Sequence, residues 1–191
     1  RLPFHRHPVT KPALRGRWRA FGTNLRIMTP AARLSAAITV LDSILQSQDA
    51  ETALTRWGRS SRFAGSGDRS AVRDLVFAAL RRKRSCAALG GAMTGRGLIL
   101  GLMRQQGVDV TGLFTGQGHA PGPVLPEEAG HLPLGLEALD CPDWLGPALK
   151  SSLGVDFEAV LCALQDRAPV FLRVNTARID HLYQDRHDPD V

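Results

Sequence analysis

The stretch that most constrains the fold is residues 65–84, GSGDRSAVRDLVFAALRRKR, which has the periodicity of one amphipathic helix. Gly65 to Gly67 signal a loop. Asp68 follows, where a carboxylate can accept hydrogen bonds from free backbone N–H groups and interact favourably with the helix dipole. Apolar residues then recur with the spacing of one buried helical face: Val72, Leu75, Val76, Ala79 and Leu80. We therefore predict a helix over residues 68–89 that packs one side into a core.

A neighbouring stripe of the same helix is cationic. At 3.6 residues per turn, Arg69, Arg73, Phe77 and Arg84 gather beside the apolar face. Such a stripe either binds an anionic partner or is simply a solvated face, and for one helix alone the solvated face is the commoner case. The choice between them has to come from the rest of the chain.

Charge is distributed unevenly along the 191 residues, whose net charge is +6. Residues 56–104 hold eleven Arg and Lys against two acids, whereas residues 105–191 hold five against thirteen. Residues 1–27 add seven Arg and Lys and no acid. Sharp polarisation of this kind favours an anionic partner for the basic segment more than a high isoelectric point alone would.

Residues 28–167 have the pattern of an all-α domain of five to seven helices, with helix 68–89 central to its packing. Thr29 with Pro30, Asp49 and Thr94 are helix-start signals. Residues 108–140 are rich in Gly and Pro and predict mostly loop. Further helices are expected from Pro142, which Pro147 would break, and over residues 156–165.

The two ends of the chain have a different character. Residues 1–27 contain three prolines and no acid, so they predict a basic disordered arm. Such an arm could contact phosphates, with Trp18 and Phe21 stacking on bases, or act as an organelle transit peptide. We favour a third interpretation, that it is not native, because Met28 suits a natural start. In residues 168–191, the run Val170 to Val174 predicts a short β-strand without partners, as if a second domain began there and was truncated.

Few residues suggest a chemical site. Gly95, Gly97 and Gly101 only approximate a dinucleotide-binding loop, and no strand precedes them. The six histidines and three cysteines lack the spacing of a metal site or a disulfide framework, so we expect no metal and reduced cysteines in a cytoplasmic protein. No run approaches the roughly 18 apolar residues that span a bilayer, so no membrane partner is expected. Cys86, at the basic end of the helix, is the one cysteine whose thiolate would gain stability from its surroundings.

Four segments together resemble one protein family. They are PAARLSAAITVLDSIL from Pro30, DRSAVRDLVFAALRRKR from Asp68, PDWL at Pro142 and FLRVNTAR at Phe171. Their order is similar to that in the RsmB/Sun family of bacterial rRNA cytosine-C5 methyltransferases, and the resemblance covers about residues 28–178. It implies a NusB-like helical RNA-binding domain, followed in the family by a catalytic domain that binds S-adenosylmethionine.

This chain departs from the family in ways that bear on activity. It contains no glycine-rich cofactor loop, and neither the Pro-Cys nor the Thr-Cys dipeptide of the two catalytic cysteines. Carbon-5 methylation needs a thiolate that adds to the base. We therefore expect no catalytic residue and no cofactor in this chain, and no RNA methylation by it. The resemblance leaves it as the rRNA-recruiting part of such an enzyme; a stand-alone NusB-type antitermination factor is the alternative.

The RNA-binding residues that we predict are the cations of the helix and of the segment before it: Arg59, Arg62, Arg69, Arg73, Arg81, Arg82, Lys83 and Arg84. They would engage phosphates as charges, without strong sequence selectivity. The competing interpretation is a protein-interaction module whose basic face meets an acidic partner or the acidic C-terminal half of its own chain.

Overall fold

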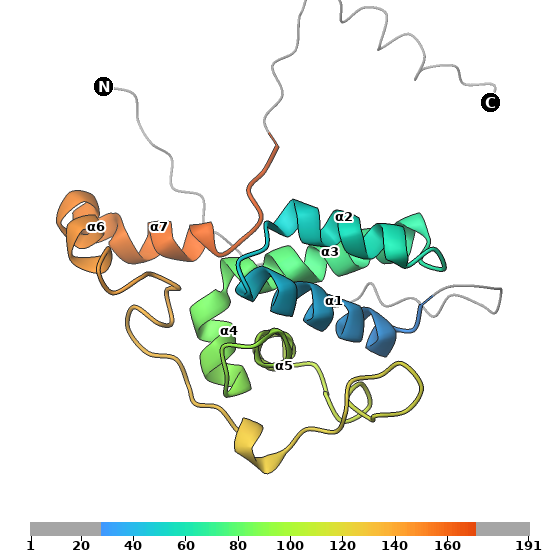
Figure 1. The fold of residues 1–191 in the computed structure, drawn as a ribbon. Helices are drawn as coiled ribbons and strands as arrows, with labels where there is room; N and C mark the ends of the chain where they lie inside the picture. Colours follow the sequence, from blue (N-terminus) through green and yellow to red (C-terminus); the bar gives the residue numbers. More distant parts are fainter. Residues whose placement is uncertain (1–27, 171–191) are drawn as a thin grey trace, which may run out of the picture.

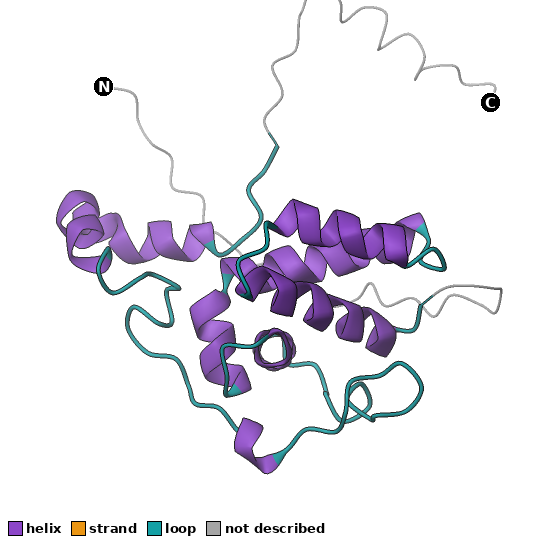
Figure 2. Cartoon of the chain, viewed as in Figure 1, coloured by secondary structure: helices purple, strands orange, loops and turns teal. Residues whose placement is uncertain are grey.

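The structure, a computed structural model, describes residues 28–170. Within that range it contains seven α-helices and no strand, which confirms the all-α prediction for those residues (Figures 1 and 2). The predicted basic arm and all but Val170 of the predicted strand lie outside the described residues.

Three of the predicted helix starts are confirmed. Helix α1 spans Pro30–Leu45, and the Thr29 hydroxyl accepts from the Ala32 N–H at 3.1 Å. Asp49 caps α2 and Thr94 caps α5 in the same way. The helices are α1 (Pro30–Leu45), α2 (Ala50–Ser60), α3 (Ser66–Arg81), α4 (Lys83–Gly90), α5 (Gly95–Gln105), α6 (Gly146–Leu153) and α7 (Phe157–Leu164), with 3₁₀ turns at Pro126–Glu128 and Gly154–Asp156.

The predicted single helix over residues 68–89 is two helices. Arg82, with φ −119° and ψ 38°, leaves the helical conformation between α3 and α4. The start is also earlier than predicted, because Asp68 lies in the first turn and its carboxylate accepts from the Gly65 N–H at 3.2 Å. The same buried carboxylate accepts from the Arg33 guanidinium at 2.8 Å, so it joins α3 to α1.

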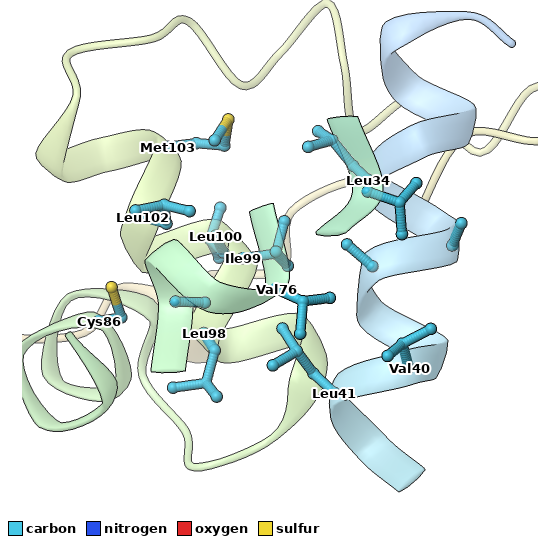
Figure 3. Close-up of a cluster of buried hydrophobic side chains, with 14 of the residues drawn as sticks. Leu34, Val40, Leu41, Val76, Cys86, Leu98, Ile99, Leu100, Leu102 and Met103 are labelled. Carbon is cyan, nitrogen blue, oxygen red and sulfur yellow. The ribbon is translucent and has the colours of Figure 1, made fainter. Parts of the chain in front are cut away.

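Helix α5, rather than residues 68–89, is the central element of the core. Its residues Leu98 to Met103 are all buried, and Figure 3 shows five of their side chains within the core. Helix α3 buries only one side. In Figure 1 α5 is seen end-on, and it packs against α1, α3 and α4. The reason is composition, because the charged residues of α5 lie near its two ends and α3 carries charge along its length.

The glycines that approximate a dinucleotide-binding loop serve helix packing. A Cβ atom at Gly101 would lie 1.9 Å from the carbonyl oxygen of Cys86, and one at Gly90 would lie 1.8 Å from that of Gly97. Helices α4 and α5 therefore approach with backbone against backbone, which any larger residue at these positions prevents.

Residues 131–167, here called the C-terminal lobe, form a second, smaller cluster. Cys141, Phe157 and Leu161 are buried in it. Figure 1 shows α6 and α7 to one side of α1–α5, with α7 ending near the junction of α3 and α4. The helix expected from Pro142 begins instead at Gly146, so Pro147 stands in its first turn, where a missing N–H is tolerated, and does not break it. The prediction of mostly loop over residues 108–140 is confirmed.

No single helix within residues 28–170 is long and apolar enough to cross a membrane. Helices α4 and α5 pass that test only together, and they meet at 91°.

Candidate nucleic-acid interface

Helices α2 and α3 run side by side and leave a groove of about 560 Å³ between them, here called the α2–α3 groove. Three of the predicted RNA-binding residues, Arg59, Arg69 and Arg73, line it, and all three are exposed. The groove is lined by Glu51, Leu54, Thr55, Trp57, Gly58, Arg59, Ser66, Arg69, Ser70 and Arg73. It thus brings together side chains from two helices that follow each other in the chain.

The periodicity of the two helices explains why these cations face outward together. In α2, Ala53 is buried and Leu54 and Trp57 pack on the core, which turns Arg59 towards solvent. In α3, burial of Val72 and Val76 has the same effect on Arg69 and Arg73. The cationic stripe is therefore a consequence of how the apolar faces pack.

Glu51 is the one acid that lines the groove, and it bonds to Arg73 at 2.8 Å. This hydrogen bond and the negative charge of Glu51 raise the pKa of Arg73. More than half of each side chain is exposed, so the pair is weak and can exchange for another anion. The Arg69 Nε donates to the Ala64 carbonyl at 3.1 Å, which holds that guanidinium against the loop between α2 and α3.

A continuation of this surface was not predicted from the sequence. Arg56 lies one turn before Arg59 on α2, and both line a shallow hollow of about 670 Å³ along the outer face of that helix. Thr55, Ser66 and Ser70 also line the α2–α3 groove, so their hydroxyls provide further hydrogen-bond donors beside those of the arginines. The i, i+3 spacing of Arg56 and Arg59 is a signal by which Arg56 could have been found.

The other predicted residues are not part of the groove. Arg62 is exposed in the loop between α2 and α3, and Lys83 is exposed at the start of α4. Arg82 bonds to Asp166 at 2.5 Å, and Arg84 bonds to Asp143 at 2.9 Å. The eight cations therefore form one group at or near the α2–α3 groove and one at the α3–α4 junction, where the C-terminal lobe meets them.

An apolar groove of about 740 Å³ adjoins α1 and was also not predicted. Its aromatic residues are Trp57 and Phe63, and Phe63 is 59% exposed. Trp57 lines both this groove and the α2–α3 groove, so the two hollows lie against the same residue. The remaining lining residues are Met28, Thr29, Ala32, Ser35, Ala36, Thr39, His119 and Ala120.

Cys86 does not have the environment of a reactive thiol. Cys86 is fully buried, and burial together with the negative charge of Asp140 raises its pKa to about 12. The expectation that its thiolate gains stability from its surroundings is therefore wrong, because desolvation outweighs the favourable effect of Arg82. Among residues 28–170, no three His, Cys, Asp or Glu side chains come together in a way that could hold a metal ion.

Comparison with known proteins identifies no relative. No family model, no curated protein and no solved structure matches the chain.

Proposed function

We propose that residues 28–167 bind RNA through the α2–α3 groove. The observation that carries this proposal is the convergence of Arg59, Arg69 and Arg73 on one groove whose acid is already paired. Guanidinium groups and hydroxyls are the donors that phosphate oxygens accept from most readily. Because these contacts are made to the backbone of the nucleic acid, they give affinity without strong sequence selectivity.

The neighbouring apolar groove supports RNA with unpaired bases. Phe63 is mostly exposed and follows Arg62 in the chain, and Trp57 lines both the apolar groove and the basic one. A base that leaves a helical stack can lie on an aromatic ring while its phosphate meets the adjacent arginines. A duplex offers phosphates but no free base faces, so a single strand suits this pair of grooves better.

The sequence motifs connect this binding to rRNA modification. PDWL and FLRVNTAR, after a helical region that opens with PAARLSAAITVLDSIL, resemble the RsmB/Sun family. On that resemblance we propose that the helices form a NusB-like bundle, that residues 170–174 open the strand-containing part of a cytoplasmic methyltransferase, and that the domain recruits rRNA to it. In that family the S-adenosylmethionine chemistry belongs to the catalytic domain that follows the helical domain.

Salt-titrated RNA binding tests the proposal. A single-stranded RNA is titrated with the full chain at salt concentrations from about 50 to about 300 mM, beside the variant R59Q/R69Q/R73Q. Each phosphate contact contributes about 0.7 to the steepness of log affinity against log salt for a single strand. The plot for the triple variant should therefore be shallower by about 2. Affinity at the lowest salt should fall about tenfold or more.

The matched control is K150Q, which removes an exposed cation from α6. Its salt slope should stay within about 0.3 of the unaltered chain, because the cation lies on the C-terminal lobe. If the triple variant and the control bind RNA alike, the groove is not the RNA site. Retained RNA binding with altered binding to an acidic protein would favour the interaction module, or a stand-alone antitermination factor that acts through protein partners.

A further inference from the structure

The C-terminal lobe contacts the second group of predicted RNA-binding residues through acids. Asp166 pairs with Arg82 at 2.5 Å, and Asp143 pairs with Arg84 through both of its oxygens at 2.9 Å. Arg84 also donates to the carbonyl oxygen of Cys141. Two of the four cations in residues 81–84 are therefore occupied by the lobe's own carboxylates and carbonyl.

Asp140 attaches the lobe to the first turn of α4. Its Oδ1 accepts from the backbone N–H groups of Arg84 at 2.8 Å and Ser85 at 2.9 Å, and its Oδ2 accepts from the Ser85 hydroxyl at 2.8 Å. Helix α4 has no cap from its own preceding side chain, so an acid 56 residues away caps its first turn. Gln165 of the lobe donates to the same carboxylate at 2.9 Å.

These contacts are polar and partly open to solvent. The side chains of Asp143 and Asp166 are 76% and 75% exposed. A cavity of about 160 Å³ remains between Arg81 and the lobe, and the buried Arg81 Nε has no hydrogen-bond partner among the described residues. The side chains of Arg82 and Arg84 are only 22% and 27% exposed, so in each pair it is the acid that faces solvent. Salt screens such half-open pairs, and a polyanion can replace their carboxylates.

We propose that the C-terminal lobe is an internal competitor of RNA, covering a second phosphate-binding surface at residues 81–84 that becomes available when the lobe is released. The lobe places carboxylates where phosphates would otherwise bind. While it is in place, the α2–α3 groove and exposed Lys83 remain open to an RNA strand. Release frees Arg82 and Arg84 and removes two like charges from the path of the RNA. This inference rests on the proposed RNA binding.

The test weakens the lobe's ion pairs and measures RNA binding. In the full chain, D143N/D166N removes both carboxylates that face Arg82 and Arg84. Two additional phosphate contacts should steepen the salt slope for single-stranded RNA by about 1.4 and tighten binding about tenfold at low salt. Hydrogen exchange at the Arg84 and Ser85 amides should accelerate as well, because these amides donate to Asp140 of the lobe.

The control variant D109N/E127Q removes the same amount of charge from exposed positions outside the lobe. It should leave the slope and the two amides unchanged. Adding R82Q/R84Q to D143N/D166N should cancel the gain, whereas R82Q/R84Q alone should alter the slope of the unaltered chain little.

The outcomes separate this inference from the proposed function. If R59Q/R69Q/R73Q lowers the slope but D143N/D166N binds RNA like the D109N/E127Q control, the lobe is a structural attachment and the inference is wrong. The inference is equally wrong if both acid-removal variants tighten binding to the same extent, since net charge alone then explains the gain. If the groove variant has no effect, the proposed function itself fails.

Discussion

The helical core α1–α5 and the C-terminal lobe are stabilised in different ways. In the core, Leu41, Leu98, Ile99 and Leu102 are fully excluded from solvent, and the cluster reaches every one of its five helices. The lobe buries only three apolar side chains, Cys141, Phe157 and Leu161, and even these retain 2–7% exposure. Its Trp144 is 79% exposed, so the lobe leaves a large aromatic side chain on its surface rather than in a core.

Their charges are used differently too. The core places acids inside, as when Asp68, 3% exposed, binds Arg33 and two backbone N–H groups. The lobe instead presents exposed acids to the cations of the α3–α4 junction. Apolar burial and enclosed polar groups resist solvent and salt, whereas exposed pairs do not. The difference indicates a rigid scaffold that carries the α2–α3 groove and a cover that is easier to detach.

The largest expected effect breaks the core at its closest helix contact. Gly101→Ala places a Cβ atom where the Cys86 carbonyl oxygen lies 1.9 Å away, so α4 and α5 must separate. Alanine gains about 1 kcal/mol of helix propensity over glycine. The separation costs more, and we expect a net loss of about 3 kcal/mol in the free energy of unfolding, measured by urea denaturation.

Gly58→Ala is the matched control. Gly58 lies inside α2, and an added Cβ would meet only the Arg69 Cδ at 4.0 Å, an ordinary contact. Here propensity acts alone, so the variant should gain up to about 1 kcal/mol. Equal effects of the two substitutions would show that the α4–α5 backbone contact does not support the core.

A smaller effect distinguishes the lobe from the core. Asp140 has φ +54°, which glycine adopts without strain, so Asp140→Gly removes the carboxylate that caps α4 and leaves the backbone free to keep its path. Two N–H groups then lose their acceptor, which costs about 1–2 kcal/mol and should raise the opening of the lobe about tenfold. The readout is thiol labelling of buried Cys141 with exposed Cys162 replaced by serine.

Cys86 in the core reports on the other region in the same sample. Its labelling should change far less than that of Cys141, because exposing it requires α4 and α5 to separate. Both Asp140→Gly and Asp140→Asn remove a negative charge that helps to raise the Cys86 pKa, so the two variants are compared with each other. Asp140→Asn keeps an acceptor oxygen and tolerates the positive φ, so it should lie close to the unaltered chain. If the labelling rates of Cys86 and Cys141 rose by the same factor, the lobe and the core would open as one unit. The lobe would then not be easier to detach than the core.

The same division explains what the sequence could and could not predict. Thr29, Asp49 and Thr94 cap helices within three residues of themselves, so their signals are local and the predictions are confirmed. No glycine or proline near Arg82 indicates that the helix breaks there. The cap of α4 is Asp140, which lies far away in the chain, so periodicity alone extends the helix across the break.

In the candidate site, too, the local features could be predicted and the long-range contacts could not. Arg59, Arg69 and Arg73 are brought together by the apolar faces of two neighbouring helices, and those faces can be predicted from periodicity. That Arg82 and Arg84 are covered could not be predicted, because pairing with Asp166 and Asp143 depends on the position of the lobe. The uneven distribution of charge along the chain is compatible with such a contact, and pairing with the acidic C-terminal half is one of the two interpretations that the sequence leaves open.

The smallest expected effect concerns the loop that joins the two regions. Glu128 accepts from Arg96 of α5 at 2.5 and 2.9 Å and from the Leu125 N–H at 2.9 Å. These bonds hold the pKa of Glu128 below its ordinary value of 4.5, and the bond to Arg96 has the largest effect. The carboxylate therefore stabilises the folded chain fully above that value, and the contribution disappears as pH falls through the lower folded pKa.

Glu128→Gln should consequently reduce the thermal midpoint at neutral pH by the equivalent of about 1 kcal/mol. The gap to the unaltered chain should shrink as pH falls below 4.5 and through the lowered pKa of the folded state. The neighbouring Glu127 is exposed, so Glu127→Gln should show little gap at any pH. A gap that widened on acidification would contradict the sign of the pKa shift. Because Arg96 lies on α5 and also stacks 5.2 Å from the Phe114 ring, the loss belongs to the core, and labelling of Cys141 in the lobe should follow it only weakly.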